Sequence, residues 1–179
     1  GSGIGRATAL RFAEEGARVV CFDTDGEAAG AVAAEVNGLS VTGDVTDPGD
    51  VAAVFREAFG TFGSVDIAFN NAGISPPDDD SILETGLDAW RRVQEVNLTS
   101  VYLCCKEVLP YMLEQGKGSI INTASFVATM AAATSSPSLS CGTANASACA
   151  TAGWRSRMPS TSSGLIFSPP RLISSFRRP

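Results

Sequence analysis

Histidine is absent from this chain of 179 residues. Its absence removes the usual base of Ser-His-Asp and Cys-His sites, so nucleophilic catalysis of those kinds is excluded. The five cysteines form no Cys-x-x-Cys pair, and we predict no metal site. We interpret them as buried thiols in a reducing compartment and predict a cytoplasmic location.

Long apolar runs are also missing. No stretch approaches the roughly 18 apolar residues that cross a bilayer, so we expect no membrane partner. The chain begins in a glycine turn rather than in a basic segment followed by an apolar one, which is unlike a secretory signal. It has no initiator Met, and we expect it to be a fragment whose start lies upstream.

Acidic residues are missing from the second part of the chain. All 19 acids lie in residues 1–114, together with seven bases, whereas residues 115–179 hold six bases and no acid. The net charge is −6. Because the body of the chain is acidic, we predict no nucleic-acid partner.

Helix and strand signals alternate up to about residue 133. Helices are predicted over 3–16, 25–36, 47–62 and 87–115, and strands over 17–22, 39–43, 65–69 and 118–123. This alternation predicts an α/β fold with a doubly wound, Rossmann-like parallel sheet. We expect the first strand of that sheet to be missing, because nothing precedes the glycine turn, and the C-terminal part to be missing as well.

The pattern changes at about Thr134. Residues 135–179 contain 12 serines and five prolines. Segments 165–167 and 172–173 are apolar, but we predict that they are too short and too closely flanked by proline to form core strands. We therefore divide the chain into a dinucleotide-binding domain over 1–133 and a Ser/Pro/Arg-rich tail over 134–179. Out-of-frame translation is one interpretation of the tail, and a divergent tail or a basic interaction arm are the alternatives.

A glycine-rich turn leads directly into the first predicted helix. Its residues are Gly1, Ser2, Gly3, Ile4 and Gly5. The glycines let the backbone approach a pyrophosphate, and the helix start attracts its negative charge. Alone the motif is weak, because spaced glycines also occur in plain turns.

Asp23 ends the next predicted strand, about 20 residues after the turn, where an acid can bond the ribose hydroxyls of an adenosine. Its carboxylate would repel a 2′-phosphate, and no basic residue stands beside it. We therefore predict NAD rather than NADP as the cofactor. The alternative is that Asp23 merely caps a turn.

Together with four further motifs, the turn resembles the short-chain dehydrogenase/reductase family. The stretches that carry the resemblance are Gly3-Ile-Gly5, Asp44-Val45, Asn70-Asn-Ala-Gly73, Val96-Asn97 and Ile121-Asn-Thr-Ala-Ser125. They occur in the family's order and span residues 1 to about 133. The resemblance implies an oxidoreductase that transfers hydride between NAD(H) and a small alcohol or ketone. It also implies a homo-oligomer built in part on the long helix.

The resemblance implies a role for each matching position. Asp44 would hold the adenine amino group and Val45 would line the ring. Asn71, Ala72 and Gly73 would pack against the ribose nearest the nicotinamide. The catalytic residues would be Ser125, which bonds the substrate oxygen, and Asn97, which interrupts its helix and holds a water. The alternatives are that Ser125 is a loop serine, that Asn97 is an ordinary helical asparagine and that Gly73 merely forms a turn.

The proton donor of the family is a tyrosine, with a lysine four residues later that lowers its pKa. We predict that this Tyr-x-x-x-Lys is absent: Tyr102 and Tyr111 lie upstream of Ser125, and no lysine follows Lys117. The nearest counterparts are Cys141 and Asn145, and an asparagine carries no charge.

Two functional hypotheses remain. The first is an NAD-dependent alcohol dehydrogenase or ketone reductase by lineage. The second is a catalytically inactive fragment that at most binds a dinucleotide. The sequence does not identify the substrate, because loops that differ between family members build its pocket.

Overall fold

The computed structural model describes residues 1–79, 83–124 and 163–168. The helices are α1 (Gly3–Glu14), α2 (Gly26–Glu35), α3 (Pro48–Phe62), α4 (Leu87–Gln94), the π-helical segment η1 (Glu95–Thr99) and α5 (Ser100–Gln115). The strands are β1 (Arg18–Asp23), β2 (Leu39–Thr42), β3 (Ile67–Asn70), β4 (Ser119–Asn122) and β5 (Ser163–Ser168).

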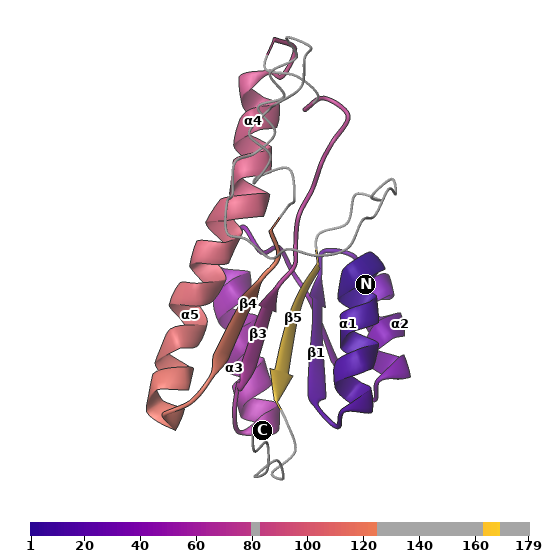
Figure 1. Ribbon diagram of the computed structural model, residues 1–179, viewed down its shortest axis with the longest axis vertical. Helices are drawn as coiled ribbons and strands as arrows, with labels where there is room; N and C mark the ends of the chain where they lie inside the picture. The colour runs from indigo at the N-terminus through magenta and orange to yellow at the C-terminus, as the bar shows by residue number, and fades with distance from the viewer. Residues whose placement is uncertain (80–82, 125–162, 169–179) are drawn as a thin grey trace, which may run out of the picture.

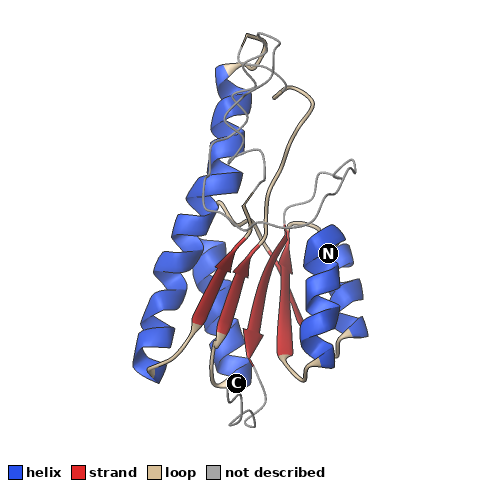
Figure 2. Cartoon of the chain, viewed as in Figure 1, coloured by secondary structure: helices blue, strands red, loops and turns tan. Residues whose placement is uncertain are grey.

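The strands form one sheet in the order β2-β1-β5-β3-β4. β1 pairs with β2 in parallel, and β3 pairs with β4 in parallel. Figures 1 and 2 show α1 and α2 on one face of the sheet, α3 and α5 on the other, and α4 beyond the end of the sheet. The prediction of a doubly wound α/β fold over the first two-thirds of the chain is confirmed.

Successive side chains of β1 pack on opposite faces of the sheet and contribute to the core on both sides. Val20 and Phe22 pack with Val54 and Phe55 of α3 and with Val108 of α5. A strand turns successive side chains to opposite faces, so the residues between them serve the other layer. On that side Val19 and Cys21 pack with α1 and α2.

Aspartates begin two of the helices. The side chain of Asp25 accepts a hydrogen bond from the backbone N–H of Ala28 at 2.9 Å. That of Asp47 accepts from Gly49 and Asp50 at 2.7 and 3.0 Å, ahead of Pro48 in the first turn of α3. These bonds satisfy N–H groups that a helix start leaves without partners. The predicted start of a helix at residue 47 is confirmed.

β5 contradicts the prediction made for segment 165–167. Ser163–Ser168 lies in the middle of the sheet and pairs antiparallel with both β1 and β3. The local pattern was insufficient because this strand depends on backbone hydrogen bonds to β1 and β3, which lie far away in the sequence. The prolines at 169 and 170 follow the last residue of the strand and therefore remove none of its hydrogen bonds.

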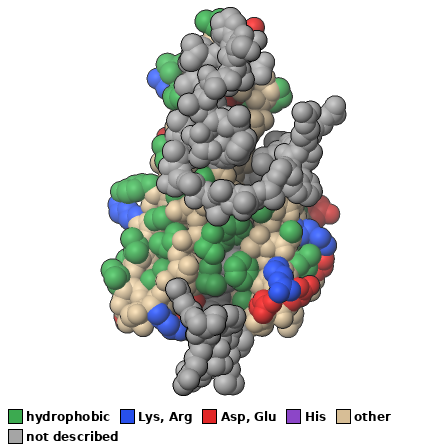
Figure 3. Space-filling model, viewed as in Figure 1, with side chains coloured by type: hydrophobic (Ala, Val, Ile, Leu, Met, Phe, Trp, Pro, Cys, Tyr) green, Lys and Arg blue, Asp and Glu red, His purple; other side chains and the backbone are tan. Residues whose placement is uncertain are grey.

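α1 and α2 cover the β1 side of their face of the sheet, and no described helix covers the side of that face formed by β3 and β4. Figure 3 shows hydrophobic side chains on this face of the molecule, outside the region drawn in grey. Ile121 of β4 is 39% exposed, and Ile67 of β3 is partly buried. Within the described part of the chain, no helix has the length and apolar character that a bilayer span requires.

Candidate functional site

The carboxyl ends of β1, β2 and β3 lie along one edge of the sheet, because these strands run in the same direction. The predicted residues Asp23, Asp44 and Asn71 end these strands or follow them. In open α/β sheets, ligands bind outside this edge, where the connections turn to opposite faces. These three predicted residues therefore lie on neighbouring parts of the same edge of the sheet.

The glycine turn enters α1 at this edge. Gly3 is the first helical residue and has a φ of +54°, a left-handed conformation that glycine adopts without strain. A Cβ at Gly3 would meet no atom within 4 Å, so the surface there is open. A Cβ at Gly1 would instead overlap the backbone of Ala28. The two glycines are thus required for different reasons: one for conformation and one for close packing.

Asp23 is the most deeply buried acid of the described chain, with 2% of its surface exposed. Its Oδ1 accepts a hydrogen bond from the backbone N–H of Asp25 at 3.1 Å, and its Oδ2 contacts the amino group of Gly1. The carboxylate therefore lies between the glycine turn and the end of β1.

Asp44 lies at the surface, whereas the neighbouring Val45 lies in the core. Asp44 is exposed, and its Oδ1 accepts hydrogen bonds from the backbone N–H and the hydroxyl of Thr46, both at 2.8 Å. Val45 is 4% exposed and belongs to the core beneath α3 and α5. The carboxylate of Asp44 is thus held at the sheet edge, while the Val45 side chain faces inward.

The loop after β3 is tied to the neighbouring strand. Asn71 Oδ1 accepts from the hydroxyl of Thr123 at 3.2 Å, and Asn70 donates to Asn122 Oδ1 at 2.8 Å. At Gly73 an added Cβ would lie 3.5 Å from Asn97, an ordinary contact. The alternative interpretation of Gly73 as a residue needed for a tight turn gains no support from this geometry.

Asn97 lies in η1, where the long rod formed by α4, η1 and α5 changes to π-helical geometry. Its Oδ1 accepts from the N–H of Ile74 at 2.7 Å, and its Nδ2 donates to the carbonyl of Ile74 at 2.8 Å. The predicted interruption of the helix at Asn97 is therefore present. Nothing in the residue pattern indicates that its amide holds the loop after β3, since Ile74 contributes only backbone atoms.

Three predicted residues lie outside the described part of the chain: Ser125, Cys141 and Asn145. Among residues that the structure does describe, no group of three histidine, cysteine or acidic side chains is arranged to hold a metal ion.

A Tyr-x-x-x-Lys spacing does occur once, at Tyr102 and Lys106, so the predicted absence of this spacing is correct only for the region after Ser125. Both residues lie on α5, and Tyr102 is 59% exposed. Lys106 Nζ lies 5.7 Å from the centroid of the tyrosine ring, over its face rather than at its hydroxyl. This is a cation–π contact of helix neighbours, not the arrangement of a proton donor with its activating cation.

The described thiols are poor nucleophiles. Burial raises the pKa of Cys21 to about 11 and that of Cys104 to about 12. Burial also raises the pKa of Cys105, whose sulfur accepts a hydrogen bond from Asn70 at 3.6 Å that acts in the opposite direction. Because the thiolate is the reactive form, these groups stay largely unreactive at neutral pH, as predicted for buried thiols.

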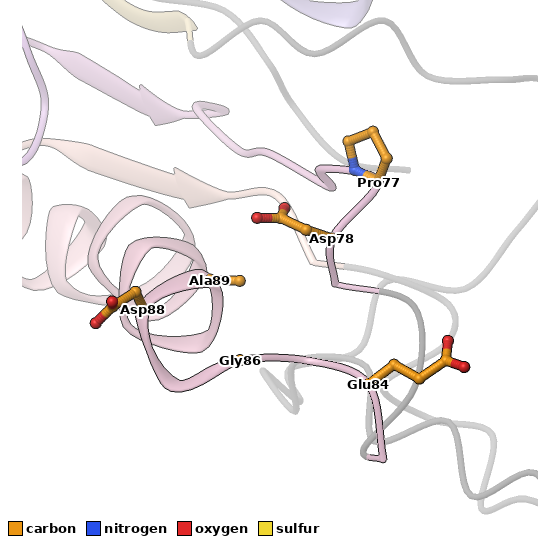
Figure 4. A pocket seen from close by; sticks show the side chains of 6 residues that line it. All are labelled: Pro77, Asp78, Glu84, Gly86, Asp88 and Ala89. Atoms are coloured by element: carbon orange, nitrogen blue, oxygen red, sulfur yellow. The ribbon is translucent and has the colours of Figure 1, made fainter.

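An open hollow of about 490 Å³ lies beside α4, lined by Pro77, Asp78, Glu84, Gly86, Asp88 and Ala89. Figure 4 shows the side chain of Asp78 turned toward α4. There Asp78 accepts two hydrogen bonds from Arg92, at 2.8 and 2.9 Å, and this pairing lowers its pKa. The acid is thus engaged in a surface ion pair, as expected of a solvated acidic loop.

The fold and this edge together define a Rossmann-type α/β protein with a glycine turn opposite a buried acid. The sequence profile described as Enoyl-(Acyl carrier protein) reductase matches residues 1–153. The chain belongs to the short-chain dehydrogenase/reductase family.

Curated relatives agree with this assignment. The chain is 43% identical over 140 residues to cis-4-hydroxycyclohexanecarboxylate dehydrogenase of Sinomonas cyclohexanicum, which covers 75% of this chain and 55% of the relative. It is 38% identical over 125 residues to 2-dehydro-3-deoxy-L-rhamnonate dehydrogenase (NAD(+)) of Sphingomonas sp. (strain SKA58), covering 69% and 50%. The chain thus spans about half the length of the curated relatives it matches.

A solved structure shares the fold. It is the crystal structure of a protein assigned to the short-chain dehydrogenases/reductases from Burkholderia xenovorans, with a TM-score of 0.61 and 39% identity. The match covers 68% of this chain and 49% of that one. The relatives in all three comparisons support oxidoreductase lineage for the chain.

Proposed function

We propose that this chain binds NAD(H) at the carboxyl edge of its sheet, as the cofactor-binding part of an oxidoreductase that acts on a small alcohol or ketone. The observation that carries the proposal is the buried carboxylate of Asp23 beside the glycine turn. A relative named as NAD(+)-dependent and relatives named as alcohol or hydroxy-acid dehydrogenases support it.

The residues at this edge fit a dinucleotide. Asp23 would accept hydrogen bonds from the adenosine ribose, and the open surface at Gly3 would let a pyrophosphate approach the start of α1. Asp44 would hold the adenine, with Val45 packed beneath it. Asn71, Ala72 and Gly73 would border the second ribose. The bound cofactor would supply the carbon that gives or receives hydride.

Asn97 and Ser125 are the residues we propose for catalysis. Asn97 fixes the loop after β3 through Ile74, which would position the bound nicotinamide ribose. Ser125 would bond the substrate oxygen. The second candidate function is dinucleotide binding without turnover, and the exposed position of Tyr102, the tyrosine that has a lysine four residues later, favours it.

Calorimetry of the purified chain with NAD and NADP tests the proposal. We expect NAD to bind at least tenfold more tightly, because a carboxylate repels the 2′-phosphate of NADP. Asp23→Ala should weaken NAD binding by about 10- to 100-fold, the loss expected for hydrogen bonds to a charged group. Glu27→Gln, which removes an exposed acid on nearby α2, should leave binding unchanged.

Equal affinity of the chain for both dinucleotides, or unchanged NAD binding after Asp23→Ala, would contradict the proposed site. Turnover of secondary alcohols with NAD separates the two candidate functions. Binding with turnover that Ser125→Ala abolishes supports the oxidoreductase. Binding without turnover supports the second candidate.

A further inference from the structure

Asp25 lies two residues beyond Asp23, at the start of α2. Its backbone N–H donates to Asp23 Oδ1 at 3.1 Å, so it bonds the carboxylate that we propose for the adenosine ribose. Its side chain is exposed and accepts from the N–H of Ala28 at 2.9 Å, which caps the helix. The carboxylate of Asp25 is therefore held close to the proposed ribose site.

The glycine turn and the start of α2 lie against each other. A Cβ built on Gly1 would lie 2.4 Å from the Cβ of Ala28, the residue whose N–H bonds the Asp25 side chain. Figure 1 shows α1, which follows the turn, beside α2 on one face of the sheet. A ribose bonded to Asp23 would therefore have the first turn of α2 as its neighbour.

The start of a helix favours a phosphate, because its N–H groups and its dipole attract negative charge. Without its cap, the start of α2 would therefore favour a dinucleotide with a 2′-phosphate on the ribose at Asp23. Asp25 instead supplies a carboxylate of its own, which takes the N–H of Ala28 and adds a negative charge. The cap thus converts a helix end that would attract a phosphate into one that repels it.

The neighbouring residues do not offset this charge. Residues 19–55 contain seven acids and no lysine or arginine. Arg6 of α1 pairs with Glu35, which is at the opposite end of α2. In the part of the chain that the structure describes, none of the ion pairs includes Asp25. A 2′-phosphate would therefore face the carboxylate of Asp25 as well as that of Asp23.

We propose that Asp25 is a second determinant of the choice between NAD and NADP, because its carboxylate at the start of α2 excludes a 2′-phosphate. The inference rests on the proposed dinucleotide site and adds to it a residue that does not bond the cofactor. Asp23 selects NAD by bonding the ribose hydroxyls, whereas Asp25 selects it by charge alone.

Neutral caps separate the charge of Asp25 from its structural role. Asp25→Asn and Asp25→Ser both keep an oxygen that can accept from the N–H of Ala28. Calorimetry with NAD and with NADP gives the ratio of the two affinities for each chain. We expect both variants to shift this ratio toward NADP by about five- to tenfold, the effect of removing one unit charge near a phosphate at a partly exposed site.

Glu57→Gln is the matched control for net charge. It removes one exposed acid from α3, which lies on the opposite face of the sheet, so it should shift the ratio by less than about twofold. The gain in the Asp25 variants should also shrink in about 0.5 M salt, since salt screens repulsion between exposed charges. A change in helix structure would not depend on salt in this way.

Two results would overturn the inference: a shift below about twofold in both Asp25 variants, or an equal shift in Glu57→Gln. The proposed function still stands in either case if the wild-type chain prefers NAD and Asp23→Ala weakens that binding. Binding of neither dinucleotide by the wild-type chain overturns the proposed function and this inference together.

Discussion

At the scale of single residues, the side chain of Asn97 makes two hydrogen bonds to the backbone of one residue. Its amide accepts from the N–H of Ile74 and donates to the carbonyl of the same residue. We expect Asn97→Ala to lower the free energy of unfolding by about 1–3 kcal/mol, because both backbone groups lose their partner in a part-buried position. Urea unfolding measures the change.

The Asn97→Asp variant provides the comparison. Asn97→Asp keeps an acceptor for the N–H of Ile74 but faces its carbonyl with a second acceptor, so it should recover only part of the lost stability. A destabilisation below about 0.3 kcal/mol for Asn97→Ala would show that the pair with Ile74 contributes little to folding.

The buried thiols predict how stability varies at high pH. In the unfolded chain cysteine ionises near pH 8.5, whereas Cys21 and Cys104 keep their protons up to about pH 11 and 12 in the folded chain. Above about pH 9 the unfolded state therefore binds fewer protons than the folded state, and stability falls as pH rises. Urea unfolding at pH 8 and pH 10 measures this loss.

Cys21→Ala should reduce the dependence on pH, since one of the two raised pKa values is removed. At pH 8 both thiols should also react with an alkylating reagent more slowly than free cysteine does. Rapid labelling of Cys21 in the folded chain would contradict its burial against α1 and α2.

The spacing in the sequence singles out Asp23 as a candidate, because an acid at a strand end, about 20 residues after a glycine turn, is a recognisable pattern. It does not single out Ile74, since the contribution of that residue is a backbone N–H and carbonyl, which carry no sequence signal. The spacing of Tyr102 and Lys106 matches Tyr-x-x-x-Lys, yet both residues lie on the exposed side of a helix. A matching spacing alone therefore does not identify a site.

At the scale of elements, the aspartate at the start of α3 is the clearest local determinant. Asp47 accepts from two backbone N–H groups of the first turn. We expect Asp47→Ala to cost about 1 kcal/mol in the free energy of unfolding, a typical value for loss of a helix cap. Thermal or urea unfolding checks it.

Asp47→Asn retains an acceptor at the same place and should cost less than the alanine variant. If alanine and asparagine were equally destabilising, the effect would lie in the negative charge near the helix start rather than in the hydrogen bonds.

Element boundaries were predicted where local chemistry sets them. The bounds of α3, β1 and β2 lie within about two residues of their predicted positions. The π-helical geometry of η1 was expected only as an interruption at Asn97. β5 was predicted wrongly, because its formation depends on two strands far away in the sequence and not on its own residues.

At the scale of the whole molecule, α3 places one phenylalanine in the core and another near the surface. Phe55 is 1% exposed and packs beneath the sheet, whereas Phe59, one turn later, is 37% exposed and lies against Tyr111 with ring centroids 5.2 Å apart. We expect Phe55→Ala to cost about 3–5 kcal/mol by leaving a cavity.

Phe59→Ala is the matched control on the same helix. It should cost about 1 kcal/mol, the contribution of an aromatic pair at a partly exposed site. Comparable losses from the two substitutions in urea unfolding would contradict the assignment of Phe55 to the core between α3, α5 and the sheet.

The reversed central strand has a consequence for the order in which this chain is made and folded. Synthesis proceeds from the N-terminus, so β1 and β3 leave the ribosome about 90 residues before β5 does. β5 can therefore pair with these two strands only after a long stretch of chain has been made, and such non-local pairing slows folding.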